Sequence, residues 1–397
     1  MSDIYIGLMS GTSLDGVDGV LVDFSSAAPA VLQHSYSPFA TSLAQELLEL
    51  NTSGADELHR AALAANALVS VYATVVSDLL SKTGIDRSRV TAIGAHGQTV
   101  RHRPQEFGMG YTLQLNNPAM LAELTGIDVV ADFRSRDVAA GGQGAPLVPA
   151  FHQAVFGRTD EVVAVLNIGG ISNITLLTPA LTDASAGGSA DRLADMIGFD
   201  CGPGNALMDY WCNRHTGQAF DAGGHWAASG RVNESLLKIL LNEPYFSKPP
   251  PKSTGRDLFN VDWLTQKLSL YDTATCPDPA RPLDPIHPVD VQTTLTELTA
   301  STCASCVLHY GKKSNCLIVC GGGAFNTYLL RRIQALIASV LPGLSVVSSQ
   351  ARGLPPMQVE ATAFAWLARK ANRRETGSLP KVTGAKGARI LGAIYPA

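Results

Sequence analysis

The sequence predicts an α/β fold with mixed sheets flanked by helices. Apolar runs of strand length alternate with helical patterns along the chain, which favours mixed layers over a sandwich or a bundle. A length of 397 residues, 46% of them hydrophobic, is sufficient for two domains or for one domain with large insertions. Glycine-bearing turns also lie at the ends of three expected strands, where loops commonly carry function. A globular protein with a ligand site built from loops is therefore expected.

Hydrophobic periodicity places the individual elements in order. Two apolar runs at 4–9 and 17–24 flank a short turn and predict a β-hairpin. Apolar residues at helical spacing over 56–82, ended by Lys82-Thr83-Gly84, predict a long helix. Further strands are expected at 90–95, 127–131, 162–168 and 316–320, and further helices near 147–156, 203–212, 230–242, 289–310, 324–339 and 358–371. The segments 178–190 and 244–254 are expected to be exposed loops or covers of an active site.

Charge and cysteine content narrow the class of partner. The formal net charge of −4, without a dense cluster of lysine and arginine, argues against nucleic acid or an anionic membrane and favours a small-molecule substrate. Seven scattered cysteines form no disulfide framework, and Cys303 and Cys306 lack a second pair at zinc spacing. No basic leader precedes an apolar stretch, and no run of about eighteen uncharged apolar residues is present. We therefore expect a cytoplasmic protein with reduced thiols.

The turn of the first hairpin, Ser10-Gly11-Thr12-Ser13-Leu14-Asp15-Gly16, is suited to hold an anion. Its glycines allow backbone N–H groups to approach a phosphate, its hydroxyls are donors, and Asp15 or Asp18 can face a magnesium ion or its waters. No Walker-type lysine is present and no helix follows directly. The turn therefore resembles the phosphate hairpin of the actin, hexokinase and heat-shock chaperone ATPases rather than a P-loop. An ordinary hairpin is the alternative interpretation.

Two more glycine turns follow expected strands. Asn167-Ile168-Gly169-Gly170-Ile171-Ser172-Asn173 separates two apolar runs and predicts a second hairpin tip with free amides. Cys320-Gly321-Gly322-Gly323-Ala324 ends a strand and opens a helix, where successive glycines permit close approach of an adenosine or an α-phosphate. Each turn alone could be structural. Their joint occurrence with the first hairpin favours a two-lobed ATPase.

A single carboxylate in a glycine-rich motif is the candidate for catalysis. Asp200 lies in Gly198-Phe199-Asp200-Cys201-Gly202-Pro203-Gly204-Asn205, which we interpret as a constrained loop before a helix that begins near Pro203. A phosphotransferase needs a base positioned for in-line attack by a hydroxyl or a water, and an aspartate on such a loop fits that role. The alternative is an aspartate that caps the helix.

Longer motifs identify a family that the chain resembles. They are 6–18 (IGLMSGTSLDGVD), 94–99 (GAHGQT), 131–134 (ADFR), 141–149 (GGQGAPLVP), the Asp200 motif, 359–361 (VEA) and the terminal 392–396 (GAIYP). These motifs resemble those of bacterial anhydro-N-acetylmuramic acid kinases, and the resemblance runs from residue 4 to the end of the chain. Cys201 departs from the family pattern, in which Thr is frequent, and it weakens hydroxyl hydrogen bonding beside Asp200.

The resemblance implies a fold and a reaction. The family belongs to the sugar-kinase, heat-shock and actin ATPase superfamily, so an actin/hexokinase-like fold with a cleft between two lobes is expected. Residues 1–132 with about 372–397 would form one lobe, and residues 133–371 the other. The implied reaction opens the 1,6-anhydro ring of the cell-wall sugar by hydrolysis and phosphorylates the freed O6 with ATP and Mg²⁺, in peptidoglycan recycling. Because a 1,6-anhydro sugar has no free O6 hydroxyl, the base must activate a water against the anomeric carbon. A homodimer is also expected.

The same resemblance assigns residues to the site. Asp200 matches the family's base, and Glu360 matches a second carboxylate expected to orient the water or the substrate. Arg134, directly after a strand, could stabilise the leaving oxygen or bind the lactyl carboxylate. His96 and Gln98, at another strand end, are expected to bind substrate. The metal ligands stay unassigned, and the expected nucleotide contacts are Gly11, Thr12, Ser13, Leu14, Asp15, Gly16, Val17, Asp18, Asn167, Gly169, Gly170, Gly202, Gly321, Gly322 and Gly323.

Structural interpretations of these residues stay open. Glu360 could be a first-turn glutamate that complements a helix dipole, and His96 could be a buried core histidine. Arg134 could simply pair with Asp132 or Asp137.

Two other points are open at the level of sequence. Lys252 or Arg256 could meet phosphate or the lactyl group, with solvation at the surface as the default. Two alternative functions are a kinase of a related anhydro sugar such as levoglucosan, and an ATP-driven binding or chaperone-like module of the same superfamily.

Overall fold

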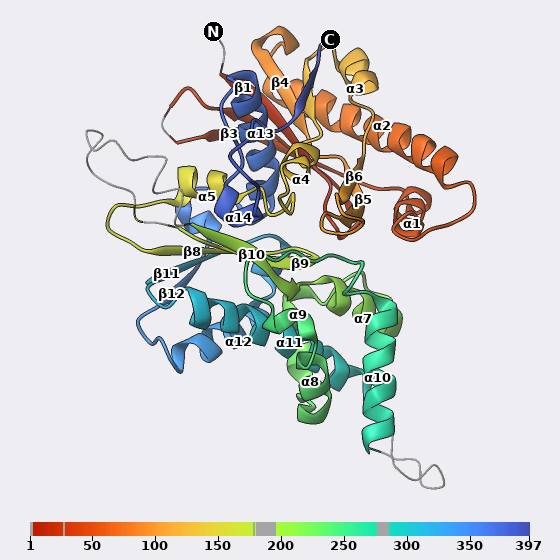
Figure 1. Cartoon of the computed structure of the whole chain (residues 1–397), viewed down its shortest axis with the longest axis vertical. Helices are drawn as coiled ribbons and strands as arrows, with labels where there is room; N and C mark the ends of the chain where they lie inside the picture. The colour runs from red at the N-terminus through yellow and green to blue at the C-terminus, as the bar shows by residue number, and fades with distance from the viewer. Residues whose placement is uncertain (1–2, 27, 178, 180–195, 276–285) are drawn as a thin grey trace.

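Two mixed sheets organise the molecule, as Figure 1 shows for the computed structural model, which describes residues 3–26, 28–177, 179, 196–275 and 286–397. The first sheet has the strand order β13-β7-β4-β1-β2-β3 and the second β10-β9-β8-β11-β12, while β5 and β6 form a separate pair. Both large sheets combine parallel and antiparallel neighbours. The predicted α/β class with mixed sheets flanked by helices is confirmed. The division into lobes at the residue numbers given above stays a prediction.

The first sheet is built from both ends of the chain. β1 pairs antiparallel with β2 across the glycine turn and parallel with β4, and the C-terminal strand β13 pairs antiparallel with β7 at one edge. The hairpin expected at the N-terminus is therefore confirmed. The strands are β1 (Ile4–Met9), β2 (Gly16–Asp23), β3 (Ala30–Pro38), β4 (Val90–Ala95), β7 (Val129–Ala131) and β13 (Ala393–Tyr395).

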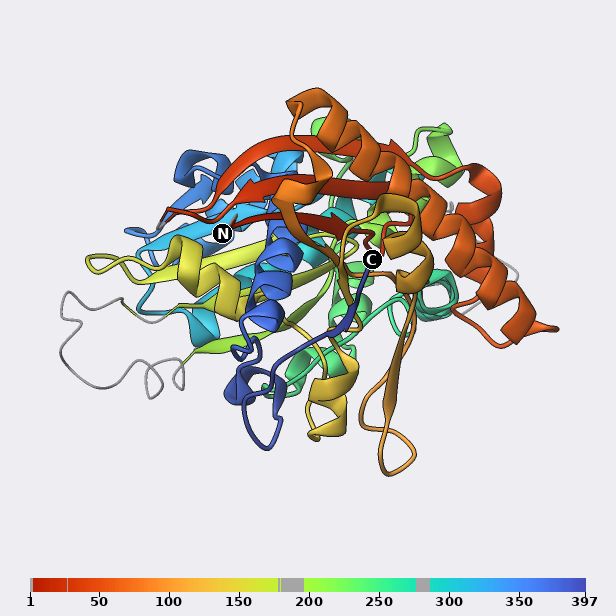
Figure 2. The ribbon, with the colours of Figure 1, turned by 90° about the horizontal axis from the view of Figure 1, so that it is seen from above.

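Helices α2 (Glu57–Thr83) and α3 (Pro118–Thr125) contribute to the hydrophobic core on one face of this sheet. Figure 2 shows α2 lying across the strands. By length and composition α2 is apolar enough to cross a membrane, a test that the core helix of a soluble protein also passes. Leu68, Tyr72 and Leu79 of α2 are fully buried in the core with the strands. The long helix expected over 56–82 is therefore a core helix here.

The second sheet has a layer of helices on its outer face. Their apolar side chains form one core with the strands, in which Leu298 of α11 and Leu317 of β11 are fully buried. The strands are β8 (Val163–Ile168), β9 (Ile171–Leu176), β10 (Ile197–Pro203), β11 (Cys316–Cys320) and β12 (Ser345–Ser348). The helices are α7 (Ala206–Thr216), α8 (Glu234–Leu241), α10 (Val261–Thr275), α11 (Pro288–Tyr310) and α12 (Thr327–Ala338).

Helices α13 (Val359–Asn372) and α5 (Pro149–Phe156) share a third core with residues of both sheets. α13 packs on β1 and β4 so closely that two strand positions must be glycine. A Cβ on Gly7 would lie 1.9 Å from the carbonyl oxygen of Ala361, and one on Gly94 would lie 2.2 Å from that of Phe364. This contact brings the start of α13, with Glu360, to the ends of β1 and β4.

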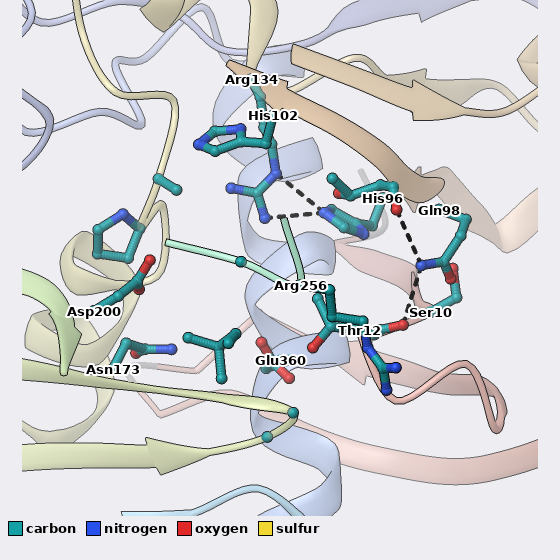
Figure 3. A pocket seen from close by; sticks show the side chains of 18 of the residues that line it. Ser10, Thr12, His96, Gln98, His102, Arg134, Asn173, Asp200, Arg256 and Glu360 are labelled. Carbon is teal, nitrogen blue, oxygen red and sulfur yellow. Dashed lines mark hydrogen bonds between the residues drawn. The ribbon is translucent and has the colours of Figure 1, made fainter. Parts of the chain in front are cut away.

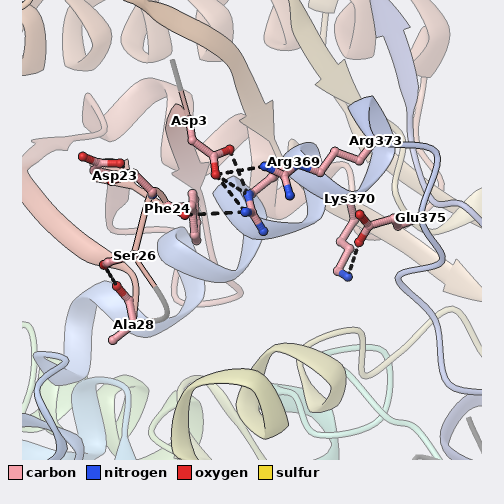
Figure 4. A network of polar contacts seen from close by, with 10 residues as sticks. Asp3, Asp23, Phe24, Ser26, Ala28, Arg369, Lys370, Arg373 and Glu375 are labelled. Atoms are coloured by element: carbon pink, nitrogen blue, oxygen red, sulfur yellow. Dashed lines mark hydrogen bonds and ion pairs between the residues drawn. The ribbon is translucent and has the colours of Figure 1, made fainter. Parts of the chain in front are cut away.

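An ion-pair network joins the N-terminus to the end of α13 (Figure 4). Arg369 donates to both carboxylate oxygens of Asp3 at 2.8–3.1 Å, and Arg373 donates to Oδ2 at 3.0 Å. The Arg369 guanidinium also lies 5.4 Å from the ring centroid of Phe24, after β2. Because Asp3 and Arg369 are both largely buried, these contacts fix α13 against the first hairpin more firmly than an exposed pair would.

Several short elements complete the described chain. β5 and β6 form an antiparallel hairpin after β4, and the others border the pocket described below or connect larger elements. They are α1 (Thr41–Glu49), β5 (Gln98–Arg103), β6 (Tyr111–Leu115), α4 (Ser135–Ala139), α9 (Pro244–Ser247), α14 (Pro380–Thr383) and short 3-10 turns. Periodicity did not indicate β3, β5, β6, β10, β12, β13, α1, α3, α4, α9, α10 or α14.

Three expectations about loops need correction. Asp200 lies within strand β10 rather than on a loop, and α7 begins at Ala206. The turn after β11 opens a 3-10 helix, and α12 itself starts at Thr327, capped by Asn326. For the segment 244–254 the alternative of an exposed loop is wrong, because Tyr245 and Lys252 are buried, while a cover of an active site stays a prediction. The loop expected at 178–190 lies outside the described residues except for residue 179.

The contact between α13 and β1 predicts that Gly7→Ala destabilises the protein strongly. Because the atom in the way belongs to the helix backbone, the helix or the strand must move, and overpacking of this kind costs at least about 2 kcal/mol. The control is Gly343→Ala, at a position where a Cβ would meet nothing within 4 Å. Chemical denaturation of the two variants should show a large loss for the first only. Equal stabilities would contradict the close packing.

Candidate active site

A pocket between the two sheets collects polar residues from both (Figure 3). Its walls come from the β1–β2 and β8–β9 tips, the hairpin β5–β6, the start of α4, the segment 254–257 and the first turn of α13. Many residues singled out in the sequence line it, namely Gly11, Thr12, Ser13, His96, Gln98, Arg134, Asn167, Gly169, Gly170, Asp200 and Glu360. Residues as far apart in the chain as Gly11 and Glu360 therefore line one cavity.

The other expected nucleotide contacts do not line this pocket. Leu14 and Val17 are buried in the core that the first sheet shares with α2, and Asp18 accepts a hydrogen bond of 2.8 Å from Nε2 of His34. The backbone oxygen of Asp15 accepts from the Tyr36 hydroxyl at 3.0 Å, and this residue is exposed. Gly16 packs on the backbone of β3, Gly202 faces Phe246, and 321–323 pack behind Ile168 and Asn205. A role of these residues in nucleotide binding stays a prediction.

The two hairpin tips face each other across the pocket. A Cβ on Gly170 would lie 2.5 Å from the hydroxyl of Thr12, so the Thr12 side chain would have to move to admit a larger residue. Gln98 fixes the first tip by donating to the backbone oxygen of Gly11 at 3.1 Å. The amides of Gly204 and Asn205 fix the second tip by donating to Gly170 and Gly169 at 2.9 and 2.8 Å. Two fixed tips with glycine amides form a surface that is suited to a polyphosphate.

Asp200 is a buried carboxylate held on strand β10. The backbone amide of Thr254 donates to its Oδ2 at 2.9 Å, and the hydroxyl of Tyr245 donates to its backbone oxygen at 2.8 Å. Burial raises the pKa of Asp200 to about 7, although the Thr254 amide and the Arg134 charge act in the opposite direction. A base with a pKa near neutrality combines availability with proton affinity, which is the optimum for general base catalysis.

Arg134 is fixed by His96 rather than by the neighbouring acids. Its Nε and Nη2 donate to Nε2 of His96 at 3.1 and 2.9 Å, and its Nη1 donates to the oxygen of Gly144 at 2.8 Å. Nε2 of His96 therefore accepts, and burial lowers the pKa of this imidazole to about 3, so the ring is neutral. Pairing of Arg134 with Asp132 or Asp137 is wrong: Asp132 accepts from the Ser135 amide, and Asp137 accepts from the Gly144 amide and from Thr383.

Glu360 lies in the first turn of α13 and also lines the pocket. Burial raises its pKa, while the Arg134 charge and a hydrogen bond with the side chain of Asn167 lower it. Arg134 acts electrostatically on both Asp200 and Glu360. The three charged groups form a cluster in which one cation faces two carboxylates.

Comparison with known proteins shows the family to which the whole chain belongs. Residues 3–397 match the model of a family described as anhydro-N-acetylmuramic acid kinase. The chain belongs to this family. Relatives with that name from Albidiferax ferrireducens and Variovorax paradoxus are 65% and 61% identical, and the alignments cover 100% of this chain and at least 99% of each relative. A third, from Cupriavidus metallidurans, is 54% identical with 100% and 98% coverage. The resemblance found in the sequence motifs is confirmed.

Solved structures are more distant from this member of the anhydro-N-acetylmuramic acid kinase family. A ROK family glucokinase from Streptomyces griseus, in complex with glucose and AMPPNP, is 15% identical with a TM-score of 0.40, and the match covers 92% of this chain and 99% of that chain. An activator of the 2-hydroxyisocaproyl-CoA dehydratase from Clostridium difficile is 12% identical with a TM-score of 0.44, at 94% and 96% coverage. The family assignment depends on neither of them.

Several pocket residues were not assigned from the sequence. His102, Asn173 and Thr254 line the pocket, as does Arg256, whose contact with a ligand was left open. Each has a buried polar atom that lacks a hydrogen-bond partner among the described residues: Nε2 of His102, Oδ1 of Asn173, Oγ1 of Thr254 and Nε of Arg256, together with Oε1 of Gln98. Because buried polar atoms are normally paired, these atoms are candidates for contacts with a polar ligand such as a sugar. For His102, the signal in the sequence is the concentration of polar residues over 98–103.

Burial of Asp200 predicts a dependence of stability on pH. Its folded pKa lies above the unfolded value, so its contribution is fully present below about pH 4 and is lost as the pH rises through about 7. Asp200→Asn lacks this loss. As the pH rises over this interval, its free energy of unfolding should therefore increase relative to that of the wild type by on the order of 3 kcal/mol. Chemical denaturation at a series of pH values measures the difference.

The matched control for this prediction is Asp209→Asn. Asp209 lies outside the pocket lining, on α7, and burial raises its pKa to about 7 as well. This variant should show the same pH-dependent gain in stability. A constant difference between Asp200→Asn and the wild type from pH 5 to pH 8 would contradict the raised pKa.

Proposed function

We propose that this chain uses ATP to convert 1,6-anhydro-N-acetylmuramic acid into N-acetylmuramic acid 6-phosphate, a step of cell-wall recycling. The observation that carries the proposal is a buried carboxylate with a pKa near 7, Asp200, in the same pocket as two facing glycine tips. Membership of the anhydro-N-acetylmuramic acid kinase family supports the substrate. The pocket supports the pairing of a base with a phosphate-binding surface.

The residues can be assigned to a reaction with two displacements, one at C1 of the sugar and one at the γ-phosphorus of ATP. Asp200 takes a proton from a water as the water oxygen bonds to the anomeric carbon C1, and the bond from C1 to O6 breaks. The departing O6 bonds to the γ-phosphorus of ATP, and ADP leaves. Arg134 faces this reaction with a fixed positive charge, which can stabilise negative charge on the leaving oxygen or on the phosphoryl group. Glu360, beside Arg134 and Asn167, is suited to orient the water or a sugar hydroxyl.

The tips of the β1–β2 and β8–β9 hairpins are suited to bind the nucleotide and its metal ion. Amides of 11–13 and 169–170 would hold phosphates, and Mg²⁺ would be bound chiefly by phosphate oxygens, water and one or two carboxylates, neutralising phosphate charge. Within the described part of the chain, no group of three or more His, Cys, Asp or Glu side chains could hold a metal alone. That finding fits an ion that arrives with the nucleotide. Asp15 and Asp18, on the first hairpin outside the pocket lining, are the carboxylates that the sequence suggests for contact with its waters.

A cytoplasmic location and a homodimer are part of the proposal. ATP is a cytoplasmic reactant, and Cys201, Cys212, Cys303, Cys306, Cys316 and Cys320 are free thiols, as expected in a reducing compartment. The homodimer is tested by light scattering of the purified protein.

The base is tested by Asp200→Asn, which should lower sugar-dependent ADP release at least about a hundredfold, because the water is no longer activated. ATP binding, measured by calorimetry, should persist, since the hairpin tips are unchanged. Asp272→Asn, at an exposed position of α10, is the control and should keep wild-type turnover. Near-normal turnover of Asp200→Asn would remove Asp200 from the mechanism.

The path of the oxygen atoms separates this reaction from that of an ordinary sugar kinase. Turnover in oxygen-18 water should place the label at the C1 hydroxyl, while the phosphate ester keeps the original O6 of the sugar. Mass spectrometry of product quenched before anomeric exchange measures the label. Unlabelled C1, or faster phosphorylation of open N-acetylmuramic acid than of the anhydro sugar, would indicate a conventional kinase. Faster turnover of levoglucosan than of 1,6-anhydro-N-acetylmuramic acid would indicate that the natural substrate is a different anhydro sugar.

A further inference from the structure

Lys252 is a buried lysine next to the proposed base. The expectation that solvent surrounds it is wrong, because only 7% of the residue is exposed. Its Nζ donates to the backbone oxygens of Tyr245 and Phe246 at 3.3 and 3.4 Å, and it lies 4.7 Å from the ring centroid of Tyr245 and 5.6 Å from that of Phe199. Among the described residues it forms no ion pair with a carboxylate. Burial of an ammonium without such a pair is costly, so a function for the charge is expected.

The segment that contains Lys252 forms three hydrogen bonds with Asp200. The backbone oxygen of Lys252 accepts from the amide of Asp200 at 3.3 Å, and the Tyr245 hydroxyl donates to the Asp200 oxygen at 2.8 Å. The amide of Thr254 donates to the Asp200 carboxylate at 2.9 Å. Because the Lys252 ammonium binds the backbone at 245–246, it closes residues 245–252 into a loop that is hydrogen-bonded to Asp200, with Thr254 just beyond it.

Charged and titratable groups from several elements act on this pair. Arg134, before α4, and Lys252 favour the ionised form of Asp200, whereas Asp257 opposes it. Lys252 in turn faces the thiols of Cys201 on β10 and Cys306 on α11. Burial lowers the pKa of Lys252, whereas these two thiols and Asp200 raise it. The pKa of the Cys306 thiol is lowered chiefly by a hydrogen bond with Cys201, and the Lys252 charge acts in the same direction.

The remaining groups around the pair contribute less directly. The exposed Lys248, on the same segment, opposes the charge of Lys252, and the Tyr245 phenol on α9 is held neutral by burial. Glu360 on α13 acts through Arg134, which faces both carboxylates. Two cations therefore act on Asp200. Arg134 lines the pocket, whereas Lys252 is buried outside the pocket lining.

We propose that Lys252 is a positioning residue for the reaction above: it fixes the segment 245–254 against Asp200 and supplies a buried positive charge that favours the ionised form of this carboxylate. The inference rests on the proposed function in that Asp200 is taken as the base. Loss of the charge disfavours the carboxylate, so Asp200 ionises at a higher pH and fewer molecules are active at neutral or acidic pH.

The test is the pH dependence of turnover in Lys252→Met, which keeps the length of the side chain and removes its charge. The midpoint of the acidic limb should move up by about one pH unit, the size expected for one charge several ångströms away at an effective dielectric constant of about 20. Turnover should fall about tenfold at pH 6 and less at pH 9, where Asp200 is ionised in both proteins. A midpoint within 0.2 unit (about the precision of such a fit) of the wild type would overturn the inference.

Three further variants separate charge from fold. Lys248→Met removes an exposed lysine 6.0 Å from the centroid of the same Tyr245 ring and should leave the profile unchanged. Lys252→Arg keeps the charge and should keep the midpoint, even if turnover falls because the larger head packs poorly. Tyr245→Phe removes only the hydroxyl and should lower turnover without moving the midpoint. A shift in Lys252→Arg as large as that in Lys252→Met would overturn the role of the charge.

A readout independent of catalysis distinguishes failure of this inference from failure of the proposed function. The Asp200 carboxyl is followed by carbon-13 NMR of protein labelled at aspartate and is identified by its loss in Asp200→Asn. Its titration midpoint should be higher in Lys252→Met than in the wild type, whether or not the sugar is a substrate. If Lys252→Met does not fold, Lys252→Arg provides the test, and an altered midpoint there contradicts the proposal. Sugar-independent ATP use with the expected NMR shift would overturn only the proposed function.

Discussion

The close contact of α13 with β1 and β4 is the constraint on which the pocket depends. Gly7 and Gly94 allow the helix backbone to touch the strands, and without this approach Glu360 would not reach the ends of β1 and β4. The first hairpin tip and His96 follow these same strand ends. One packing contact between backbones therefore sets the spacing of the groups from the first sheet.

The pocket concentrates charge where water is scarce. Asp200 and Glu360 have raised pKa values because burial disfavours their ionised forms, and the charge of Arg134 acts on both in the opposite direction. Neutral His96 orients this arginine through an acceptor nitrogen and adds no charge of its own. Such an arrangement reduces stability, as expected where a site is built for charge that develops during a reaction.

The sequence predicted the parts of this site that are local, and it missed those that depend on distant pairing. The tips at 10–16 and 167–173 were recognisable because glycine and hydroxyl residues stand between apolar runs. Strand β10 was not, because its sequence IGFDCGP contains the glycines and proline of a turn, and it becomes a strand only by pairing with β9. Likewise, nothing near Lys252 indicates burial, since Tyr245 and Phe199 cover it only in the folded chain. The partner of Arg134, 38 residues away, was equally hidden.

The union of the two ends of the chain in one sheet has a consequence for biosynthesis. Asp3 is paired with Arg369, and β13 adds the last strand to a sheet whose first strands are the first to be made. On the ribosome the N-terminal hairpin must therefore wait, with one face uncovered, until more than three hundred further residues have been added. The second sheet can assemble earlier, because β8 to β12 and their helices lie within one continuous stretch. The first sheet is thus expected to be the last to complete its fold, and the more exposed to aggregation before it does so.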